Sequence, residues 1–298
     1  MNENNLVSII VIAYNHERYI LDCLKSISCQ TYKNIELIVI DNKSTDNTLS
    51  LINTYANNNK KDNIHIIASK DNLGVIGGIK LGIKISSGDF ITFFASDDIM
   101  IHDRIEKQVN FLINNPCVTG CFGNMLRIND NGEIYNSKLL PAVTKKEYRL
   151  DDILYKRINL YSPTQLYRKK LLLSVINEIP SDLKIEDIWM YHKLLANNCI
   201  LYTLPYLFTL YRIHGTNTHS KYKMMMNEKI KILSEYRDET YYSKALNFIY
   251  LEHFSVFSSH SKLEAIKLFP KIMFNITSRY YWIGLARFIF DWRSLWGK

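Results

Sequence analysis

Two neighbouring acids, Asp97 and Asp98, follow directly on a continuous apolar run from Phe90 to Ala95. Such a run predicts a strand buried on both faces, so the two carboxylates stand where the chain leaves the sheet. In open α/β sheets, ligands bind at this edge. Paired carboxylates there suit Mg²⁺ or Mn²⁺ and, through the ion, phosphate groups. Together with Ser96, the same acids are also typical helix-capping residues, and the sequence leaves both interpretations open.

Three earlier segments also place polar residues after a predicted strand. They are Ala13-Tyr14-Asn15-His16, the segment from Asp41 to Asp46, and the segment from Ser69 to Gly74. A single acid after a strand is usually a turn or cap residue. Four polar loops that leave one edge of one sheet instead indicate a binding site.

The elements that position these loops follow from the hydrophobic periodicity. Strand and helix alternate over the first hundred residues, which predicts an α/β fold whose parallel sheet is covered on both faces. A mixed region then reaches about Tyr211, and from about Tyr222 the pattern is helical. The predicted strands are 7–13, 35–40, 64–68, 90–95, 118–122 and 202–211, the predicted helices are 17–29, 45–57, 74–85, 103–113, 144–155, 169–177 and 187–197, and a hairpin is predicted over 127–135.

The composition is that of an ordinary folded protein, with 298 residues, 47% hydrophobic residues and 22% charged ones. The net charge is +8, and residues 262–298 contribute +5 of it, with seven basic residues and two acids. This segment indicates an anionic surface, but its basic residues alternate with bulky apolar ones, which argues against nucleic acid. Five cysteines without a CxxC pair predict reduced thiols in the cytosol. Neither a secretory signal nor a membrane span is predicted.

Taken together, the segments resemble the nucleotide-sugar-binding half of family 2 glycosyltransferases, which have the GT-A fold. The match is close over residues 6–110 and weakens to about 220. The resembling segments are 7–15 (VSIIVIAYN), 29–32 (CQTY), 36–41 (ELIVID), 44–48 (STDNT), 72–74 (NLG) and 87–98 (SGDFITFFASDD). Many pieces in one order make the resemblance specific, where each piece alone is weak.

The resemblance implies a Rossmann-like, mostly parallel central sheet with helices on both faces, followed by a C-terminal helical extension. Residues 1–220 would form the GT-A domain. Its first half, 1–110, would bind the nucleotide sugar, and its second half, 111–220, would hold the acceptor and the catalytic groups. Residues 221–298 would form a helical region that contacts a membrane or forms a homo-oligomer.

The same resemblance implies roles for residues that bind the donor. Asp41 would accept a hydrogen bond from the uracil ring, and Asp97 would contact the ribose or the metal ion. Ala95 stands where many members carry a first acid, so it stays open whether Asp97 or Asp98 touches the ion. The residues implied to line the donor site are Ala13, Tyr14, Asn15, Asp41, Asn42, Asn72, Gly74, Ser96, Asp97 and Arg212, and those implied to hold the ion are Asp97, Asp98 and His214.

Two later motifs complete the implied site. Glu186-Asp187 resembles the family's motif for the catalytic base, with Asp187 as the base and Glu186 orienting it or contacting the acceptor. The alternative is an ordinary helix N-terminus, which favours acids through its dipole. In the stretch from Tyr211 to His214, the histidine would bind the ion or the diphosphate, and Arg212 would neutralise the leaving group.

The function implied is that of an inverting, metal-dependent glycosyltransferase, of the hexosyl or N-acetylhexosaminyl class. It would move a sugar from a nucleotide diphosphate, with UDP expected, to a hydroxyl of a glycan or a polyprenyl-diphosphate-linked glycan. It would act in bacterial surface polysaccharide synthesis, O-antigen or capsule, as a cytoplasmic protein at the inner face of the membrane. Mn²⁺ or Mg²⁺ would hold the diphosphate. Two alternatives are a metal-dependent nucleotidyltransferase and a non-catalytic subunit that binds sugar nucleotides or glycans.

The C-terminal segment has its own pattern. Residues 278–298 contain three of the four tryptophans. One helical side would carry Tyr281, Leu285, Phe288, Trp292 and Leu295, and the other Arg287, Asp291, Ser294 and Lys298. Aromatic residues with basic charge are typical of an interfacial membrane helix, whereas an apolar stripe is usually packed in a core or against a second subunit. The sequence leaves both interpretations open.

Overall fold

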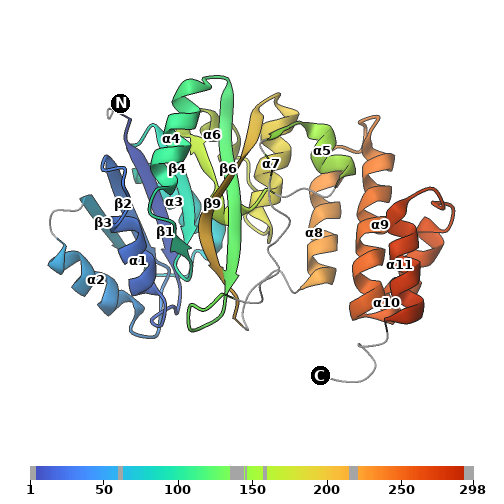
Figure 1. The fold of residues 1–298 in the computed structure, drawn as a ribbon, viewed down its shortest axis with the longest axis horizontal. Helices are drawn as coiled ribbons and strands as arrows, with labels where there is room; N and C mark the ends of the chain where they lie inside the picture. The colour runs from blue at the N-terminus through green and yellow to red at the C-terminus, as the bar shows by residue number, and fades with distance from the viewer. Residues whose placement is uncertain are drawn as a thin grey trace. The chain divides into compact units, whose positions relative to one another are not determined.

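The computed structural model describes residues 5–59, 63–134, 144, 146–156, 160–214 and 221–291. Two compact units make up the chain (Figure 1). The first holds Met1–Arg149, Asn159–Asp182 and Met190–Gly215. The second holds Leu150–Ile158, Leu183–Trp189 and Thr216–Lys298. The helices after residue 216 thus share their unit with two short segments from earlier in the chain.

A nine-stranded sheet forms the centre of the first unit, in the order β3-β2-β1-β4-β8-β6-β9-β5, with β7 paired to β9. Strands β3, β2, β1 and β4 run parallel, and so do β6 and β9, while β8 is antiparallel to both of its neighbours. The predicted mostly parallel sheet is therefore confirmed. The strands are β1 Val7–Ala13, β2 Ile35–Asp41, β3 Asn63–Ala68, β4 Phe90–Ala95, β5 Ile99–Met100, β6 Val118–Ile128, β7 Lys146–Tyr148, β8 Leu166–Arg168 and β9 Ile200–Arg212.

Helices cover both faces of this sheet, because successive side chains of a strand point to opposite sides. Val7, Ile9 and Val11 of β1 belong to the core that α1, α2 and α4 close. On the other face, a Cβ at Gly82 of α3 would lie 2.5 Å from Ile10, so glycine there allows close packing on the sheet. The helices are α1 Ile20–Ser28, α2 Thr48–Asn58, α3 Gly74–Ile85, α4 Arg104–Asn114, the 3-10 turn η1 Ser162–Thr164, α6 Lys169–Ile176 and α7 Glu186–Ala196.

Two predicted elements differ from the structure. The helix predicted over 144–155 is wrong in its first half, where β7 adds to the edge of β9 and only Leu150–Tyr155 forms a helix, α5. The strand predicted over 118–122 extends to Ile128, because its whole length pairs with β9. A tight turn follows, in which the Asn129 N–H donates to the Glu133 carbonyl at 2.8 Å. The last residue of the predicted hairpin, Tyr135, lies outside the described residues.

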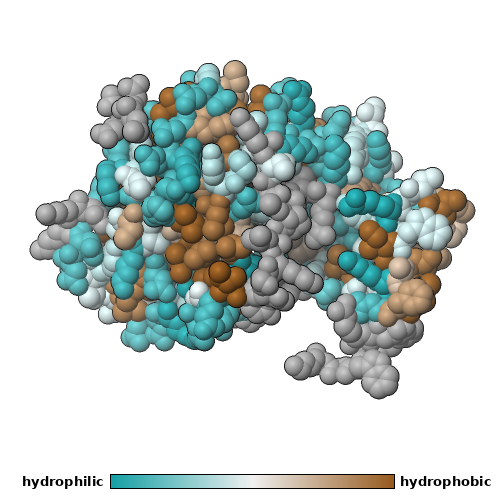
Figure 2. Space-filling model, viewed as in Figure 1, coloured by the Kyte–Doolittle hydropathy of each residue, from teal (hydrophilic) through white to brown (hydrophobic). Residues whose placement is uncertain are grey.

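The second unit is built around one long helix, α9 (Tyr242–His260). Its neighbours α8 (Tyr222–Ser234), α10 (Lys262–Ile272) and α11 (Arg279–Phe290) enclose a separate hydrophobic core with it. A Cβ at Gly284 would lie 2.4 Å from the Phe254 ring, which shows how closely α11 packs on α9. On the outer faces of α10 and α11, hydrophobic side chains remain exposed (Figure 2).

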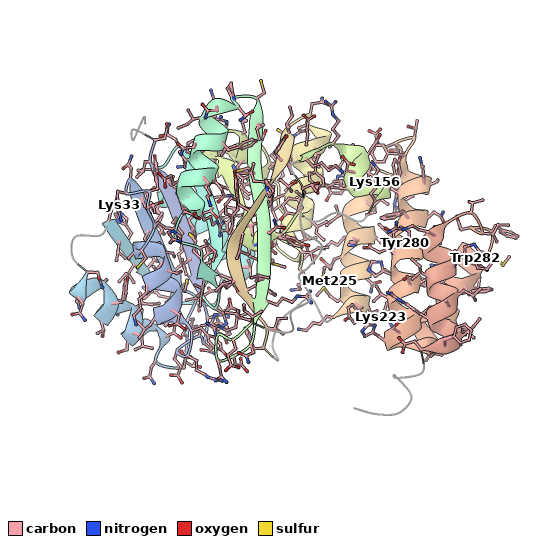
Figure 3. All side chains as sticks on the ribbon, in the orientation of Figure 1. Lys33, Lys156, Lys223, Met225, Tyr280 and Trp282 are labelled. Carbon is pink, nitrogen blue, oxygen red and sulfur yellow. The ribbon has the colours of Figure 1, made fainter. Side chains whose placement is uncertain are left out.

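The aromatic stripe of the C-terminal segment turns out to be part of this core. Tyr281 is buried, and Leu285 and Phe288 pack against the same cluster. Tyr280 also packs toward α9, in edge contact with Phe248, whereas Trp282 points outward (Figure 3). Of the two interpretations of this stripe, core packing is therefore the correct one for its described part. Trp292 and Leu295 lie outside the described residues.

None of the described helices combines the length and the hydropathy needed to cross a membrane. All five cysteines lie in the described part of the chain, and all are free thiols. Burial raises the pKa of Cys121 to about 12, so this thiol is inert in the core.

Candidate active site

The first two polar loops form one joined rim at the carboxyl ends of β1 and β2. Ala13 and Asp41 are register partners, and the Asn42 N–H donates to the Ala13 carbonyl at 2.8 Å. Beyond them, Asn15 adopts a left-handed φ of 54°, a conformation that asparagine tolerates well. Its Oδ1 accepts a hydrogen bond from the Thr45 N–H at 2.8 Å. The exposed Tyr14 is thus carried by a loop that both strands hold in place.

One carboxylate oxygen of Asp41, at the base of this rim, is buried and has no hydrogen-bond partner among the described residues. The residue is 2% exposed, and its Oδ2 accepts the Ser44 N–H at 3.1 Å. Its Oδ1 is buried and accepts no hydrogen bond from the described residues. A buried acceptor without a donor costs about 1–3 kcal/mol, which a ligand donor would recover. The arrangement suits an N–H group such as that of a uracil ring.

Asn42 and Asn72 connect the second and third loops to each other. The Asn42 amide donates to Asn72 Oδ1 at 3.0 Å, and its own Oδ1 accepts the Leu73 N–H at 2.7 Å. Asn72 Oδ1 also accepts the N–H of Gly74, which adopts a φ of +65° that favours glycine. Asn42 is almost fully buried, while Asn72 and Gly74 are exposed. Asn42 therefore positions the third loop, and any contact of Asn72 or Gly74 with the donor stays a prediction.

Three side chains from distant parts of the chain converge at the end of β4. His214 Nε2 lies 2.7 Å from Asp97 Oδ2, and His16 Nδ1 lies 2.7 Å from the Ser96 hydroxyl. One ligand atom from each of His16, Asp97 and His214 can be chosen so that all lie within 4.8 Å of one another. These groups come from the first loop, the fourth loop and the end of β9. The cluster is the best candidate metal site among the described residues.

The pKa values of the two histidines shift in opposite directions. Burial lowers the pKa of His16, so its ring is neutral near pH 7 and offers a lone pair. The hydrogen bond to Asp97 raises the pKa of His214. The His214 ring also stacks on Tyr19, with 5.5 Å between the ring centroids. Both rings are therefore held at the site by contacts within the first unit.

Asp98 lies next to this cluster but does not join it. Its side chain is fully buried, Oδ1 accepts the Arg212 N–H at 2.9 Å, and Oδ2 has no partner among the described residues. Burial and the neighbouring Asp97 raise the pKa of Asp98 well above its usual range. Asp97, and not Asp98, thus belongs to the cluster with His16 and His214, and which of the two acids binds an ion stays a prediction.

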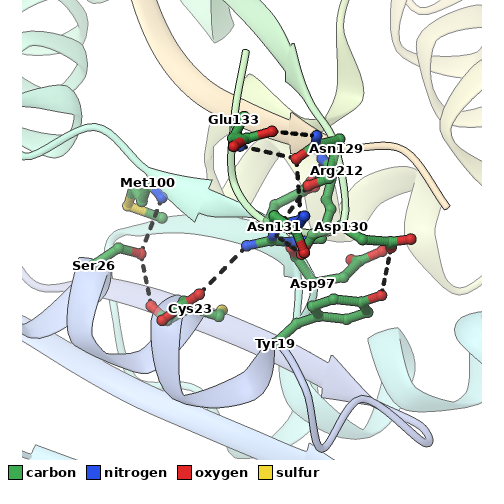
Figure 4. A network of polar contacts seen from close by, with 12 residues as sticks. Tyr19, Cys23, Ser26, Asp97, Met100, Asn129, Asp130, Asn131, Glu133 and Arg212 are labelled. Carbon is green, nitrogen blue, oxygen red and sulfur yellow. Dashed lines mark hydrogen bonds and ion pairs between the residues drawn. The ribbon is translucent and has the colours of Figure 1, made fainter. Parts of the chain in front are cut away.

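Arg212 makes buried contacts with two loops of the first unit. Only 1% of its side chain is exposed. Its guanidinium donates to the main-chain carbonyls of Asp97, Asn129 and Asp130 at 2.9–3.1 Å (Figure 4). The same group lies 4.8 Å from the centroid of the Tyr19 ring. Arg212 therefore holds the fourth loop against the turn after β6, and its predicted contact with a leaving diphosphate stays a prediction.

We expect Arg212→Met to lower the free energy of unfolding by about 3 kcal/mol, because three carbonyls would lose a buried cationic donor. Thermal melting of the purified variant checks this result. Arg18→Met is the matched control, since Arg18 is exposed and also lies near the Tyr19 ring. If the variant had normal stability but no longer bound UDP, we would conclude that Arg212 contacts the diphosphate.

Glu186 and Asp187 lie in the second unit, in the first turn of α7. Asp187 Oδ1 accepts the Ile188 N–H at 2.8 Å. Burial and the neighbouring Asp187 charge raise the pKa of Glu186 to about 8. Glu186 therefore keeps its proton near pH 7. The role of Asp187 as catalytic base stays a prediction.

Asn15, Asp41, Ser96, Asp97 and His214 all lie in the first unit, and their roles in binding the donor and the ion stay predictions. Sequence reasoning placed His16 in the first loop but assigned it no role, and it overlooked Tyr19. The available signal was the position of His16 directly after a strand, at the same sheet edge as Asp97. The pairing with His214 depends on β9 returning to this edge, which no local pattern shows.

Comparisons with known proteins agree with this arrangement. Residues 8–175 match the model of glycosyl transferase family 2. An uncharacterised glycosyltransferase of Haemophilus influenzae is 31% identical over 96% of this chain and 93% of its own length. The Escherichia coli enzyme UDP-Glc:alpha-D-GlcNAc-diphosphoundecaprenol beta-1,3-glucosyltransferase WfgD is 34% identical over 43% of this chain and 49% of its own.

Solved structures show the same fold. S. aureus TarS 1–349 in complex with UDP-GlcNAc has a TM-score of 0.65 and 23% identity, covering 97% of this chain and 89% of that one. The mannosyltransferase PcManGT from Pyrobaculum calidifontis, in complex with GDP-Man and Mn²⁺, has a TM-score of 0.61 and 14% identity, covering 97% and 88%. The predicted GT-A fold is thereby confirmed. By its sequence over more than half its length, the chain belongs to glycosyl transferase family 2.

Proposed function

We propose that this glycosyltransferase moves a hexosyl or N-acetylhexosaminyl group from a UDP-sugar to a glycan hydroxyl with inversion of the anomeric centre. The acceptor oxygen forms a bond to the anomeric carbon as the bond from that carbon to the diphosphate oxygen breaks. The acceptor proton passes to Asp187, and UDP leaves. The observation that carries the donor class is the buried Asp41 oxygen without a donor, at the same sheet edge as Asp97.

The side chains at the end of β4 fit a divalent ion. Neighbouring ligands of an ion with bonds of about 2.2 Å lie roughly 3 Å apart, close to the 2.7 Å between His214 and Asp97. His16, Asp97 and His214 would hold the ion, which supplies positive charge for the diphosphate. Two imidazole nitrogens argue against Mg²⁺, which takes oxygen ligands, and favour Mn²⁺.

His16→Ala is expected to weaken Mn²⁺ binding at least about tenfold, because a neutral ligand is lost. The measurement is a titration of free Mn²⁺ by electron paramagnetic resonance in the presence of UDP. His102→Ala is the control, since this exposed histidine lies outside the cluster. If the Mn²⁺ affinity of His16→Ala were unchanged, the His16 ring would serve only as a hydrogen-bond partner of Ser96.

The acceptor class rests on relatives. WfgD is named for transfer to a sugar on diphosphoundecaprenol, and TuaG of Bacillus subtilis is named as a putative teichuronic acid biosynthesis glycosyltransferase. On this basis we place the reaction in bacterial surface polysaccharide synthesis, with a polyprenyl-diphosphate-linked glycan as acceptor. Such an acceptor is anchored in a bilayer, so the enzyme would act as a peripheral protein at the cytoplasmic face of the membrane.

A panel of nucleotide sugars tests the donor class. Thermal stabilisation and slow hydrolysis are measured for UDP-, GDP- and dTDP-linked sugars, each with and without Mn²⁺. We expect stabilisation by UDP-sugars, larger with Mn²⁺, and loss of the uracil preference in Asp41→Ala, because the Asp41 oxygen would no longer meet the ring N–H. Equal stabilisation by GDP-sugars would contradict the proposed donor, whereas dTDP-sugars, whose thymine carries the same ring N–H, test only the contribution of the ribose.

A further inference from the structure

The outer surface of the second unit is unusually apolar. Ten of the seventeen large hydrophobic side chains that are exposed among the described residues lie between Leu263 and Phe290. Four of them form what we call the apolar tip, at the turn between α10 and α11: Met273, Phe274, Ile276 and Trp282, with exposed fractions of 42%, 85%, 59% and 55%. The Trp282 indole donates to the Ile276 carbonyl, so the turn and the start of α11 form one piece. Contiguous exposed apolar surface of this kind marks an interaction site.

These side chains are not needed for the core of their own unit. α10 already packs inward through Ala265, Leu268 and Ile272, and α11 through Tyr281 and Gly284. The exposed residues occupy the opposite sides of the same helices, as the outward direction of Trp282 illustrates (Figures 2 and 3). Both helices therefore carry apolar side chains on two faces, and only one of these faces packs against α9.

Charge indicates what would cover the second face. Between Glu264 and Asp291 the chain has four basic residues and no acid. Two of them flank the apolar tip directly: Lys271 lies in the last turn of α10, and Arg279 is the first residue of α11. Both are exposed. Exposed aromatic and aliphatic side chains with a basic border are the pattern of a protein surface that docks on an anionic bilayer.

We propose that the apolar tip docks on an anionic lipid bilayer, with Phe274, Ile276 and Trp282 in the headgroup region and Lys271 and Arg279 at the lipid phosphates. This surface lies opposite the stripe that the sequence suggested, which is core. Docking would bring the enzyme to a lipid-linked acceptor, and only this purpose rests on the proposed function. Docking is measured without donor or acceptor, so its failure and that of the proposed function are distinguishable.

Sedimentation of the full chain with vesicles tests the proposal, using phosphatidylcholine alone or mixed with phosphatidylglycerol. We expect binding to the mixed vesicles that weakens as salt is added, since surface charge is screened. The double change Phe274→Glu and Ile276→Glu should lower the partition coefficient at least about tenfold. The double change Lys271→Gln and Arg279→Gln should lower it several-fold on mixed vesicles only. Leu173→Glu, at an exposed leucine of α6, is the matched control and should leave it unchanged.

Thermal stabilisation by UDP in each variant shows that the fold and the donor site are intact. Three results would overturn the proposal. One is the absence of binding to the mixed vesicles, and another is binding that the tip variant leaves unchanged. The third is self-association, seen by light scattering, that the Phe274→Glu and Ile276→Glu changes abolish, which would make a second copy of the chain the partner of this surface.

Discussion

Asp187→Asn is expected to lower the rate of sugar transfer by about 10³-fold, within the range that loss of a general base produces. The change keeps the size of the side chain and removes the group that would accept the acceptor proton. Binding of UDP should persist, because the donor-binding groups lie in the first unit and Asp187 lies in the second. Transfer to a lipid-linked glycan is measured beside UDP-dependent thermal stabilisation of the same preparation.

Asp151→Asn is the control for this experiment, since it makes the same chemical change in the first turn of another helix of the second unit, α5. If Asp187→Asn transferred the sugar at the wild-type rate, Asp187 would not be the catalytic base. Wild-type protein that binds UDP-sugars but transfers nothing to any acceptor would favour the non-catalytic subunit. Release of pyrophosphate from a nucleoside triphosphate would favour the nucleotidyltransferase.

Glu186 offers an independent check through pH. Burial and the neighbouring Asp187 raise its pKa to about 8, so Glu186 loses its proton as the pH rises through that value. A second negative charge beside the base repels the first, so the activity of the wild type should change near pH 8. Glu186→Gln keeps a neutral side chain at all pH values and should remove that step. A wild-type profile that is flat through pH 8 would contradict the raised pKa of Glu186.

The donor-binding half of the fold was accessible from sequence because its signals are local. β1, α3 and β4 begin and end at the predicted residues, since continuous β-branched and aromatic runs specify buried strands and regular apolar spacing specifies the helices between them. The region from 118 to 215 was less accessible. β7 and the second half of β6 exist because they pair with β9, whose residues lie far away in sequence. A short segment such as Lys146–Tyr148 carries no periodicity that could reveal this pairing.

The residues of the candidate site also differ in how far the sequence alone could identify them. Asp41 and Asp97 were identifiable because each follows a predicted strand, so the parallel sheet alone brings their loops together. Arg212 was predicted as a ligand of the diphosphate because it is a basic residue near the predicted diphosphate site, and that role stays a prediction. Its burial and its bonds to three carbonyls arise only from packing between β9 and the turn after β6. Similarly, Ala95 indicated a missing ligand, and the residue that we propose in its place, His16, lies in another loop.

Asp97→Asn is the second change for which we expect a large effect, a loss of about 10²–10³-fold in transfer together with loss of Mn²⁺-dependent stabilisation by UDP. The amide keeps the shape of the side chain and a partner for His214, which Asp97 contacts at 2.7 Å. It removes the one negative charge in the cluster of His16, Asp97 and His214. Mn²⁺ binding in the presence of UDP and transfer are measured on the same protein.

Asp98→Asn separates the two acids that the sequence left as alternatives. Asp98 is fully buried and turns one oxygen to the Arg212 N–H, so an amide there should cost stability but leave Mn²⁺ binding in place. If Asp98→Asn abolished Mn²⁺ binding and Asp97→Asn did not, Asp98 would be the ligand of the ion. The cluster of His16, Asp97 and His214 would then serve only to hold the loops together through hydrogen bonds. The contrast between two neighbouring acids with the same substitution is decisive because the changes differ only in which carboxylate points at the two histidines.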